Sequence, residues 1–349
     1  MKKIKFGLIT SLTLILIVSG YILVTKSHQS ISSTTYNKDS SLYIDFVDEK
    51  LKHIVYEVNL KKFKEKNLLK KDLKDYPTSA YSKKDKILYF TEETRNKDQQ
   101  LFQQELYKNL YKKRKQLTYN FNYVDFLRLD DHRNIIYMRV LLDSNDRDFH
   151  VAKMDLNTKE IKVFNKENKN NSVVWFDYNP KTQQLLMINK SIKEEAKNIN
   201  LSNEKDQPLK APKYTATIFK EKDNSTKRIF SAHKFIDSAA LSPDGEEILF
   251  SWKNSIDPEA SSTISLFDIQ TKKEKVVLKD SKELINVHQP LYSKGGNGFY
   301  FIADLNKVIK NKTTNTQMHP STIKFFDFNS NEIEDVWFKE NGTPINIYL

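Results

Sequence analysis

Three ionisable residues stand at matching places before a repeated turn in this chain of 349 residues. Asp125, Asp237 and His288 each lie four residues before the apolar residue that opens the turn, in the strings YVDFL, FIDSA and NVHQP. A core strand would prefer an apolar side chain there, so these groups could hold a cation, an ordered water or a polar group of a ligand. They could equally be capping, turn or solvated residues at strand ends. The outcome depends on the fold that positions them.

Motifs of several enzyme classes are absent from the sequence. There is no G-x-S-x-G nucleophile motif, and the seven glycines lack the spacing of a P-loop or a dinucleotide fingerprint. The chain has no cysteine and no H-x-x-x-H or H-x-H pair. No cofactor or metal is therefore predicted, and a non-catalytic protein is favoured. The alternative is a hydrolase or lyase that uses a metal or paired carboxylates, with the three residues above as its nucleus.

A turn of constant plan recurs along the chain. Each copy has an apolar residue, then Ser, Asp or Asn, a polar turn, and three apolar residues. The five copies are YSKKDKILYF (81–90), LDDHRNIIYM (129–138), YNPKTQQLLM (178–187), LSPDGEEILF (241–250) and YSKGGNGFYF (292–301). Their second positions are 48, 49, 63 and 51 residues apart. The period is near 50, and a polar insertion at 193–213 explains the long interval.

A second pattern recurs in phase with the first. Residues 154–164, 267–278 and 326–338 each read as strand, short Asx-type turn, strand. Each repeat therefore supplies four antiparallel strands, which is typical of one blade of a β-propeller. Residues 41–69 and 342–349 together complete a further blade and close the ring, because the terminal strand can pair with the N-terminal strands. The sequence predicts an all-β propeller of about six blades, with five and seven as alternatives. The innermost strand of each blade would line a central channel, so Asp125, Asp237 and His288 are expected at one end of that channel.

The stretch LSPDGEEILFSW carries a family resemblance. It resembles the PD40 repeat of WD40-like propellers of the TolB type, and the weaker copies follow its register. In this stretch Pro243 presets the turn, Asp244 caps it and Gly245 accepts a positive φ before the next strand. The resemblance implies a propeller over most of residues 41–349. It assigns no chemistry to the motif itself.

The N-terminus carries a segment able to cross a membrane. Residues 6–24, FGLITSLTLILIVSGYILV, contain no charged side chain. As a helix they would span roughly 28 Å, close to the hydrocarbon core of a bilayer. Three lysines precede this segment and Lys26 follows it, so the N-terminus is expected in the cytoplasm and the remaining chain outside.

These features predict a membrane protein with a single span and an extracytoplasmic C-terminal domain. Its parts are a cytoplasmic basic n-region at 1–5, a transmembrane signal-anchor helix at 6–24, a flexible spacer at 25–40 and a propeller ectodomain at 41–349. The alternative is a secreted protein, since Val18-Ser19-Gly20 would also serve as a signal-peptide cleavage site.

The predicted exterior part is basic. Without the four lysines that flank the span, 53 basic and 45 acidic residues leave a net charge of +8. A dense basic run in LYKNLYKKRKQL could contact an anionic envelope polymer or acidic lipid through Lys108, Lys112, Lys113, Arg114 and Lys115. It could equally be a solvated outer strand. The location disfavours nucleic acid as a partner and leaves a protein bound on a propeller face as the other expected partner.

Overall fold

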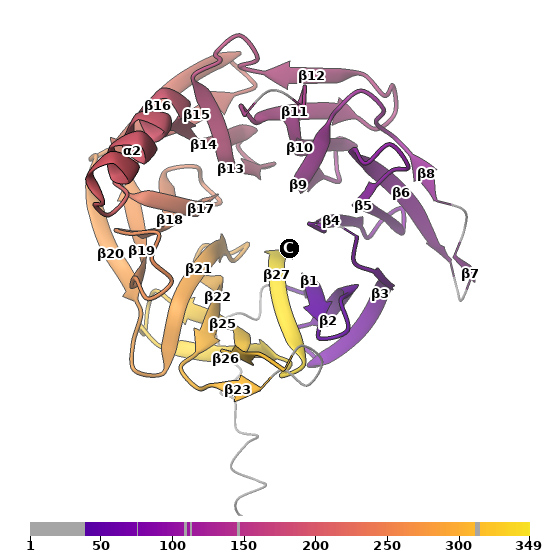
Figure 1. The fold of residues 1–349 in the computed structure, drawn as a ribbon. Helices are drawn as coiled ribbons and strands as arrows, with labels where there is room; N and C mark the ends of the chain where they lie inside the picture. Colours follow the sequence, from indigo (N-terminus) through magenta and orange to yellow (C-terminus); the bar gives the residue numbers. More distant parts are fainter. Residues whose placement is uncertain (1–38, 75, 108–109, 112–113, 145–146, 311–314) are drawn as a thin grey trace, which may run out of the picture. The chain divides into compact units, whose positions relative to one another are not determined.

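Short apolar runs between polar turns form antiparallel strands, and these strands assemble into a ring of sheets (Figure 1). The computed structural model describes residues 39–74, 76–107, 110–111, 114–144, 147–310 and 315–349. All of them belong to one unit, Tyr36–Leu349. Six sheets surround a common centre, so the predicted six-bladed propeller is confirmed.

The strands of each blade follow one another from the centre of the ring outward. Blade 1 contains β27 (Gly342–Tyr348), β1 (Ser41–Asp48), β2 (Lys52–Asn59) and β3 (Lys64–Asp72). Blade 2 contains β4 (Ser79–Ser82), β5 (Ile87–Glu93), β6 (Gln99–Tyr107) and β7 (Leu110–Tyr111), and β8 (Lys115–Gln116) also pairs with β6. Blade 3 contains β9 (Tyr123–Asp130), β10 (Ile135–Leu141), β11 (His150–Asp155) and β12 (Ile161–Phe164).

The other three blades have the same order. Blade 4 contains β13 (Asn171–Asn179), β14 (Gln184–Ser191), β15 (Tyr214–Lys220) and β16 (Ser225–Ala232). Blade 5 contains β17 (Phe235–Leu241), β18 (Glu247–Lys253), β19 (Ser262–Asp268) and β20 (Glu274–Lys279). Blade 6 contains β21 (Leu284–Tyr292), β22 (Gly298–Leu305), β25 (Ser321–Asp327) and β26 (Ile333–Phe338).

The repeated turn joins the first and second strands of a blade and defines one face of the ring, the turn face. In blade 5 the Ser242 hydroxyl donates to the Asp244 carboxylate at 2.6 Å and accepts from the amide of Glu247 at 2.9 Å. Gly245 has a φ of +78°, and a Cβ added there would lie 2.3 Å from Oε1 of Gln184 in the neighbouring blade. The glycine therefore provides both the positive φ and the close approach of two blades.

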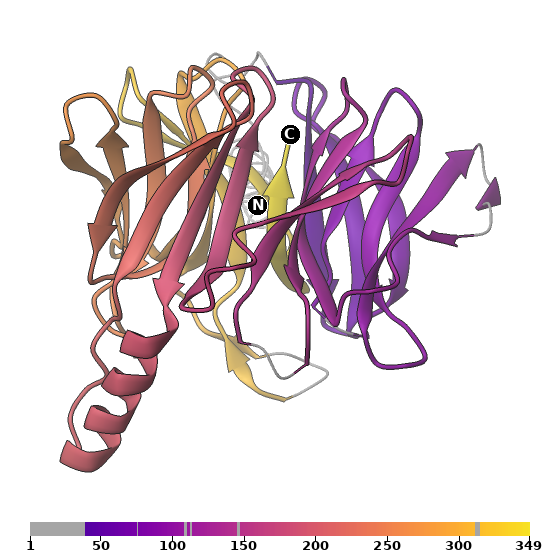
Figure 2. The same cartoon turned by 90° about the horizontal axis from the view of Figure 1, so that it is seen from above.

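The opposite face, the loop face, carries two insertions between the second and third strands. Blade 6 has a small hairpin of β23 (Ile309–Lys310) and β24 (Gln317–Met318). Blade 4 has the helix α2 (Ile192–Lys205), in the segment that the sequence indicates only as a polar insertion. Both project from the same side of the ring (Figure 2).

The ring is closed where β27 pairs with β1. Asp45 on β1 is completely buried and accepts hydrogen bonds from the Ser79 hydroxyl at 2.6 Å, the Ser79 amide at 3.0 Å and the Asn346 amide at 3.1 Å. The Ser79 hydroxyl also lies 2.9 Å from the hydroxyl of Tyr348. This cluster joins both ends of the described chain to blade 2.

Apolar side chains fill the spaces between blades. Trp175 of blade 4 packs edge-on against Phe126 of blade 3 at 4.2 Å between ring centroids, and its indole N–H donates to the carbonyl of Ala239 in blade 5. Trp337 of blade 6 likewise contacts Phe46 of blade 1. The aromatic residues thus hold successive blades together.

The predicted membrane segment, residues 6–24, lies outside the described residues. Within the part of the chain that the structure describes, no helix combines the length and the apolar character needed to span a bilayer.

Candidate functional site

The three predicted channel residues all lie on innermost strands, with Asp125 on β9, Asp237 on β17 and His288 on β21. Each of these strands has a β-bulge near that residue, where the pairing with the second strand shifts. A bulge reverses the face on which the following side chains lie. The bulge lies at a slightly different position in each strand. Residues that align in the sequence therefore have different surroundings in the structure.

Asp125 is engaged inside the protein. The bulge of β9 leaves Phe126 unpaired and places Asp125 opposite Arg139. Arg139 donates to both carboxylate oxygens at 2.7 and 2.5 Å, and Asp125 is only 2% exposed. Arg139 also donates to the carbonyl of Val174 at 2.6 Å. The carboxylate therefore takes part in a bidentate ion pair that links blades 3 and 4.

Asp237 occupies a different position. It is itself the unpaired residue of the bulge in β17, and its side chain is exposed. The hydroxyls of Ser238 and Ser251 both donate to its Oδ1. The Ser238 hydroxyl in turn accepts from the backbone amide of Gln289 at 2.9 Å, which connects this group to β21.

His288 is half-buried between two shifts of pairing. Its Nδ1 lies 2.6 Å from the carbonyl oxygen of Asn286, so Nδ1 carries the proton and donates. The three residues thus have different partners, and no group of three His, Asp or Glu side chains suited to a metal occurs among the described residues. A common ligand for Asp125, Asp237 and His288 stays a prediction.

The structure describes only part of the predicted basic run. Lys108, Lys112 and Lys113 lie outside them. Arg114 forms an ion pair with the buried carboxylate of Glu92, and Lys115 is exposed on the short strand β8. Contact of this run with an anionic polymer stays a prediction.

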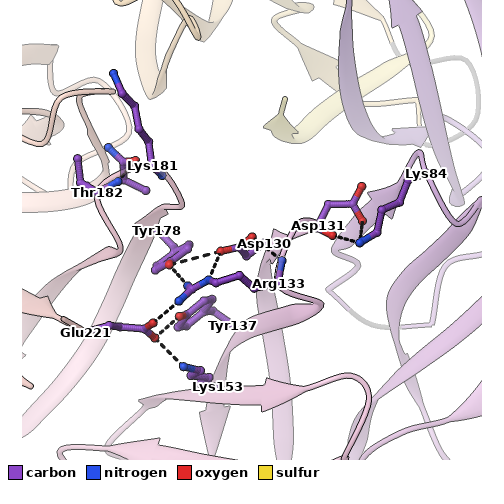
Figure 3. Close-up of polar contacts among 11 residues, drawn as sticks. Lys84, Asp130, Asp131, Arg133, Tyr137, Lys153, Tyr178, Lys181, Thr182 and Glu221 are labelled. Atoms are coloured by element: carbon purple, nitrogen blue, oxygen red, sulfur yellow. Dashed lines mark hydrogen bonds and ion pairs between the residues drawn. The ribbon is translucent and has the colours of Figure 1, made fainter.

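A polar network between blades 3 and 4 was not indicated by the sequence (Figure 3). Glu221, in the turn between β15 and β16, accepts from Arg133 at 2.7 Å and from Lys153 at 2.9 Å, and also from the hydroxyl of Tyr137. Arg133 further donates to Asp130 at 2.7 Å. Because these partners are far apart in the sequence, no local pattern could have indicated the network.

The electrostatics of this network follow from burial and hydrogen bonding. Burial acts to raise the pKa of Glu221, but hydrogen bonds from Tyr137, Lys153 and Arg133 outweigh it and lower the pKa. Burial raises the pKa of Tyr178, which stacks on Tyr137 at 4.1 Å between centroids, to about 12. Glu221 therefore remains charged and joins the two blades as a structural ion-pair network.

The loop face presents the most protruding element of the ring, α2. Ser191 caps the helix by accepting from the amide of Glu194 at 3.3 Å, a pairing typical of an S-x-x-E capping motif. The Glu194 carboxylate reaches back to the amide of Lys213 and to His233, both at 3.0 Å. None of the 14 helical residues is buried. The first turn thus anchors a helix that contributes no buried side chain.

The chain is similar in sequence to a protein of Bacillus subtilis. No protein-family model matches the chain. It is 27% identical over 332 residues to an uncharacterized protein of Bacillus subtilis (strain 168), YdjN, with 93% of this chain and 92% of that protein aligned.

Two solved structures illustrate the propeller likeness. The structure of TolB from Acinetobacter baumannii matches this chain with a TM-score of 0.57 at 14% sequence identity. The match covers 88% of this chain and 66% of the TolB chain. The structure of oligogalacturonate lyase from Vibrio parahaemolyticus matches this chain with a TM-score of 0.51 at 12% sequence identity. The match covers 86% of this chain and 73% of the lyase chain. At such low identities the likenesses establish the fold and leave function open.

Proposed function

We propose that this protein is a membrane-tethered, extracytoplasmic propeller that acts as a non-catalytic binding or scaffolding module and engages a protein partner at its loop face. The tether and location follow from the uncharged segment 6–24 and the lysines that precede it. The TolB-like fold is compatible with such a module but does not specify it.

The observation that carries the proposal is the exposed helix on a closed scaffold. A 14-residue helix with no buried residue contributes little to the core, yet its first turn is held by Ser191, Glu194 and Lys213. The β23–β24 hairpin projects from the same face (Figure 2). A rigid ring that holds exposed elements on one side is suited to binding a partner surface.

The spacer would join the propeller on the other face. Asp39, the first described residue, accepts from the amide of Lys294 in a turn-face turn and from the hydroxyl of Tyr300. The chain therefore enters the ring at the turn face. This point of entry lies on the face opposite the one that carries α2.

Replacement of α2 tests the proposal. Residues 193–209 are exchanged for a short Gly-Ser linker, and chemical crosslinking in cells is compared with that of the intact chain. We expect the variant to keep the propeller fold and to lose its principal crosslinked protein. Retention of the same partner at the same yield by a folded variant would contradict a role for this face.

The alternative, a hydrolase or lyase in the channel, has one observation in its favour. Asp237 is exposed on an innermost strand and receives two serine hydroxyls. Its test is metal analysis of the purified chain. A stoichiometric divalent ion that is lost in Asp237→Ala would favour the enzyme over the binding module.

A further inference from the structure

A groove lies beside the interrupted outer strand of blade 2. Here the outer edge of β6 is covered by two short strands, β7 and β8, of two residues each. Three adjoining hollows share residues at this place: Glu92 lines all three, whereas Lys71, Lys74 and Arg114 each line two. They form a continuous depression between blades 1 and 2, which we call the blade 2 groove.

Basic side chains predominate along the blade 2 groove. Its lining includes four acidic residues and six basic ones, which are Lys70, Lys71, Lys74, Arg95, Lys97 and Arg114. Glu92, only 5% exposed, holds Lys71 at 3.1 Å and also pairs with Arg114. Asp98 accepts from Thr94 and from Gln100.

Three of the six basic side chains are available to bind a ligand. Lys74, Arg95 and Lys97 are exposed and form no ion pair with other described residues. Glu92 thus fixes both Lys71 and Arg114 in place, and the six basic side chains of the lining exceed its four acidic ones, which leaves a net positive charge. Such a lining attracts an anionic ligand.

The deep end of the groove contains buried polar atoms that could bind a ligand group. His53 is fully buried, and its Nε2 donates to the Asp45 carboxylate at 2.8 Å. Nδ1 has no partner among the described residues, and neither does Oε1 of Gln99, which is 1% exposed. The amide nitrogen of Gln99 already donates to Tyr76 and Thr91.

His53 and Gln99 both border the smallest hollow, which leaves about 10 Å³ open to the centre of a water molecule. That is room for about one water or one hydroxyl group. An O–H group from a ligand could donate to an acceptor there, and the largely buried ammonium of Lys71 lines the same space. The deep end therefore has room for a single hydroxyl group of a ligand.

An aromatic surface completes the groove. Tyr119 is 66% exposed at its outer end, and the guanidinium of Arg114 lies over the ring of Phe102 at 5.8 Å. Aromatic faces bind the apolar faces of sugar rings, and their polar edges remain wet. Cations, hydroxyl acceptors and an aromatic face together match one class of ligand.

We propose that the blade 2 groove binds an acidic polyhydroxy chain, a glycan or polyol polymer that carries carboxylate or phosphate groups. The anionic groups contact Lys74, Arg95 and Lys97, and a hydroxyl reaches Gln99 and His53 at the deep end. This site is on blade 2, whereas α2 is on blade 4, so it does not depend on the protein partner proposed above.

Binding of defined polymers to the full chain tests this inference. Alginate oligomers supply carboxylates with hydroxyls, and a poly(glycerol phosphate) supplies phosphates with hydroxyls; their relative affinities identify the anionic group. Neutral dextran lacks charge, and poly-L-glutamate lacks hydroxyls. We expect one of the first two to bind with an affinity that falls as salt is added. Binding of neither, or equal binding of poly-L-glutamate, would overturn the proposal.

Matched variants locate the site. Arg95→Glu with Lys97→Glu should weaken binding roughly tenfold or more, since two cations at the rim become anions. Tyr119→Ala should weaken it without changing the slope of the salt dependence. Lys61→Glu with Lys62→Glu makes the same change in net charge at exposed positions between β2 and β3 and should leave binding unchanged. An equal loss in both charge-reversal variants would show a nonspecific attraction and overturn the assignment to the groove.

Discussion

At the scale of single residues, ion pairs between blades carry much of the specificity of this ring. Glu221 belongs to blade 4, and its partners Arg133, Tyr137 and Lys153 belong to blade 3. The network can form only when the two blades are docked in the correct register. A half-buried, fully paired group of this kind is costly to break by removing one partner.

Glu221→Gln should therefore destabilise the protein in a pH-dependent manner. The pKa of Glu221 is lowered below its ordinary value of 4.5 in the folded state. Its charge thus contributes stability that is fully present above that value and is lost as the pH falls through the folded-state pKa. We expect a loss of roughly 1–3 kcal/mol in the free energy of unfolding at pH 7, shrinking toward acid pH.

Denaturant titrations at several pH values measure this effect. Glu160→Gln is the matched control, because Glu160 is exposed and its side chain has no ion pair among the described residues. A difference between the two variants that does not depend on pH would contradict the assigned role of Glu221.

The sequence predicted the strands that carry the candidate site residues but not the contacts of their side chains. The spacing placed Asp125, Asp237 and His288 on innermost strands, where the structure has them. The spacing could not reveal that the bulge of β9 pairs Asp125 with Arg139, whereas the bulge of β17 exposes Asp237. No repeated residue pattern at these positions marks where the pairing shifts, so the sequence alignment treats the three strands as equivalent.

At the scale of elements, the repeated turn is the part that sequence describes best. Its Ser, Pro, Asp and Gly act through the hydrogen bonds and dihedral angles of four neighbouring residues, so local chemistry suffices. Helix α2 was not predicted, because none of its faces is buried and no apolar stripe marks it. The Ser191 and Glu194 capping pair was the available signal.

The turns offer a comparison of two glycines. Gly245 and Gly296 have φ values of +78° and +70°, but a Cβ at Gly296 would only make ordinary contacts of 3.7 Å with Pro243. Both alanine variants should lose about 1–2 kcal/mol from the positive φ. Gly245→Ala should lose more, because its Cβ would meet Gln184 of the neighbouring blade. Thermal unfolding measures both, and equal losses would argue against close contact of blades 4 and 5.

At the scale of the whole molecule, the ring depends on its closure. β27 covers the edge of β1 and contributes Asn346 and Tyr348 to the buried cluster around Asp45. An open ring would expose that sheet edge and leave a buried carboxylate short of a partner. Closure was foreseeable from the sequence because neither terminal segment forms a blade alone.

Deletion of residues 342–349 should therefore cost several kcal/mol and promote aggregation. Replacement of residues 193–209, a longer segment, should change the unfolding temperature little, because α2 has no buried residue. Calorimetry of both variants decides this comparison. A deletion variant as stable as the intact chain would contradict closure by β27.

The most direct test of the proposed function compares the two faces of the ring in cells. A photo-crosslinking amino acid is placed at Lys197 on α2 or at Lys273 in the turn between β19 and β20, both of which are exposed lysines. We expect a discrete protein adduct from position 197 and none from position 273. Adducts from position 273 alone, or the same adducts from both positions, would contradict a partner site on the loop face.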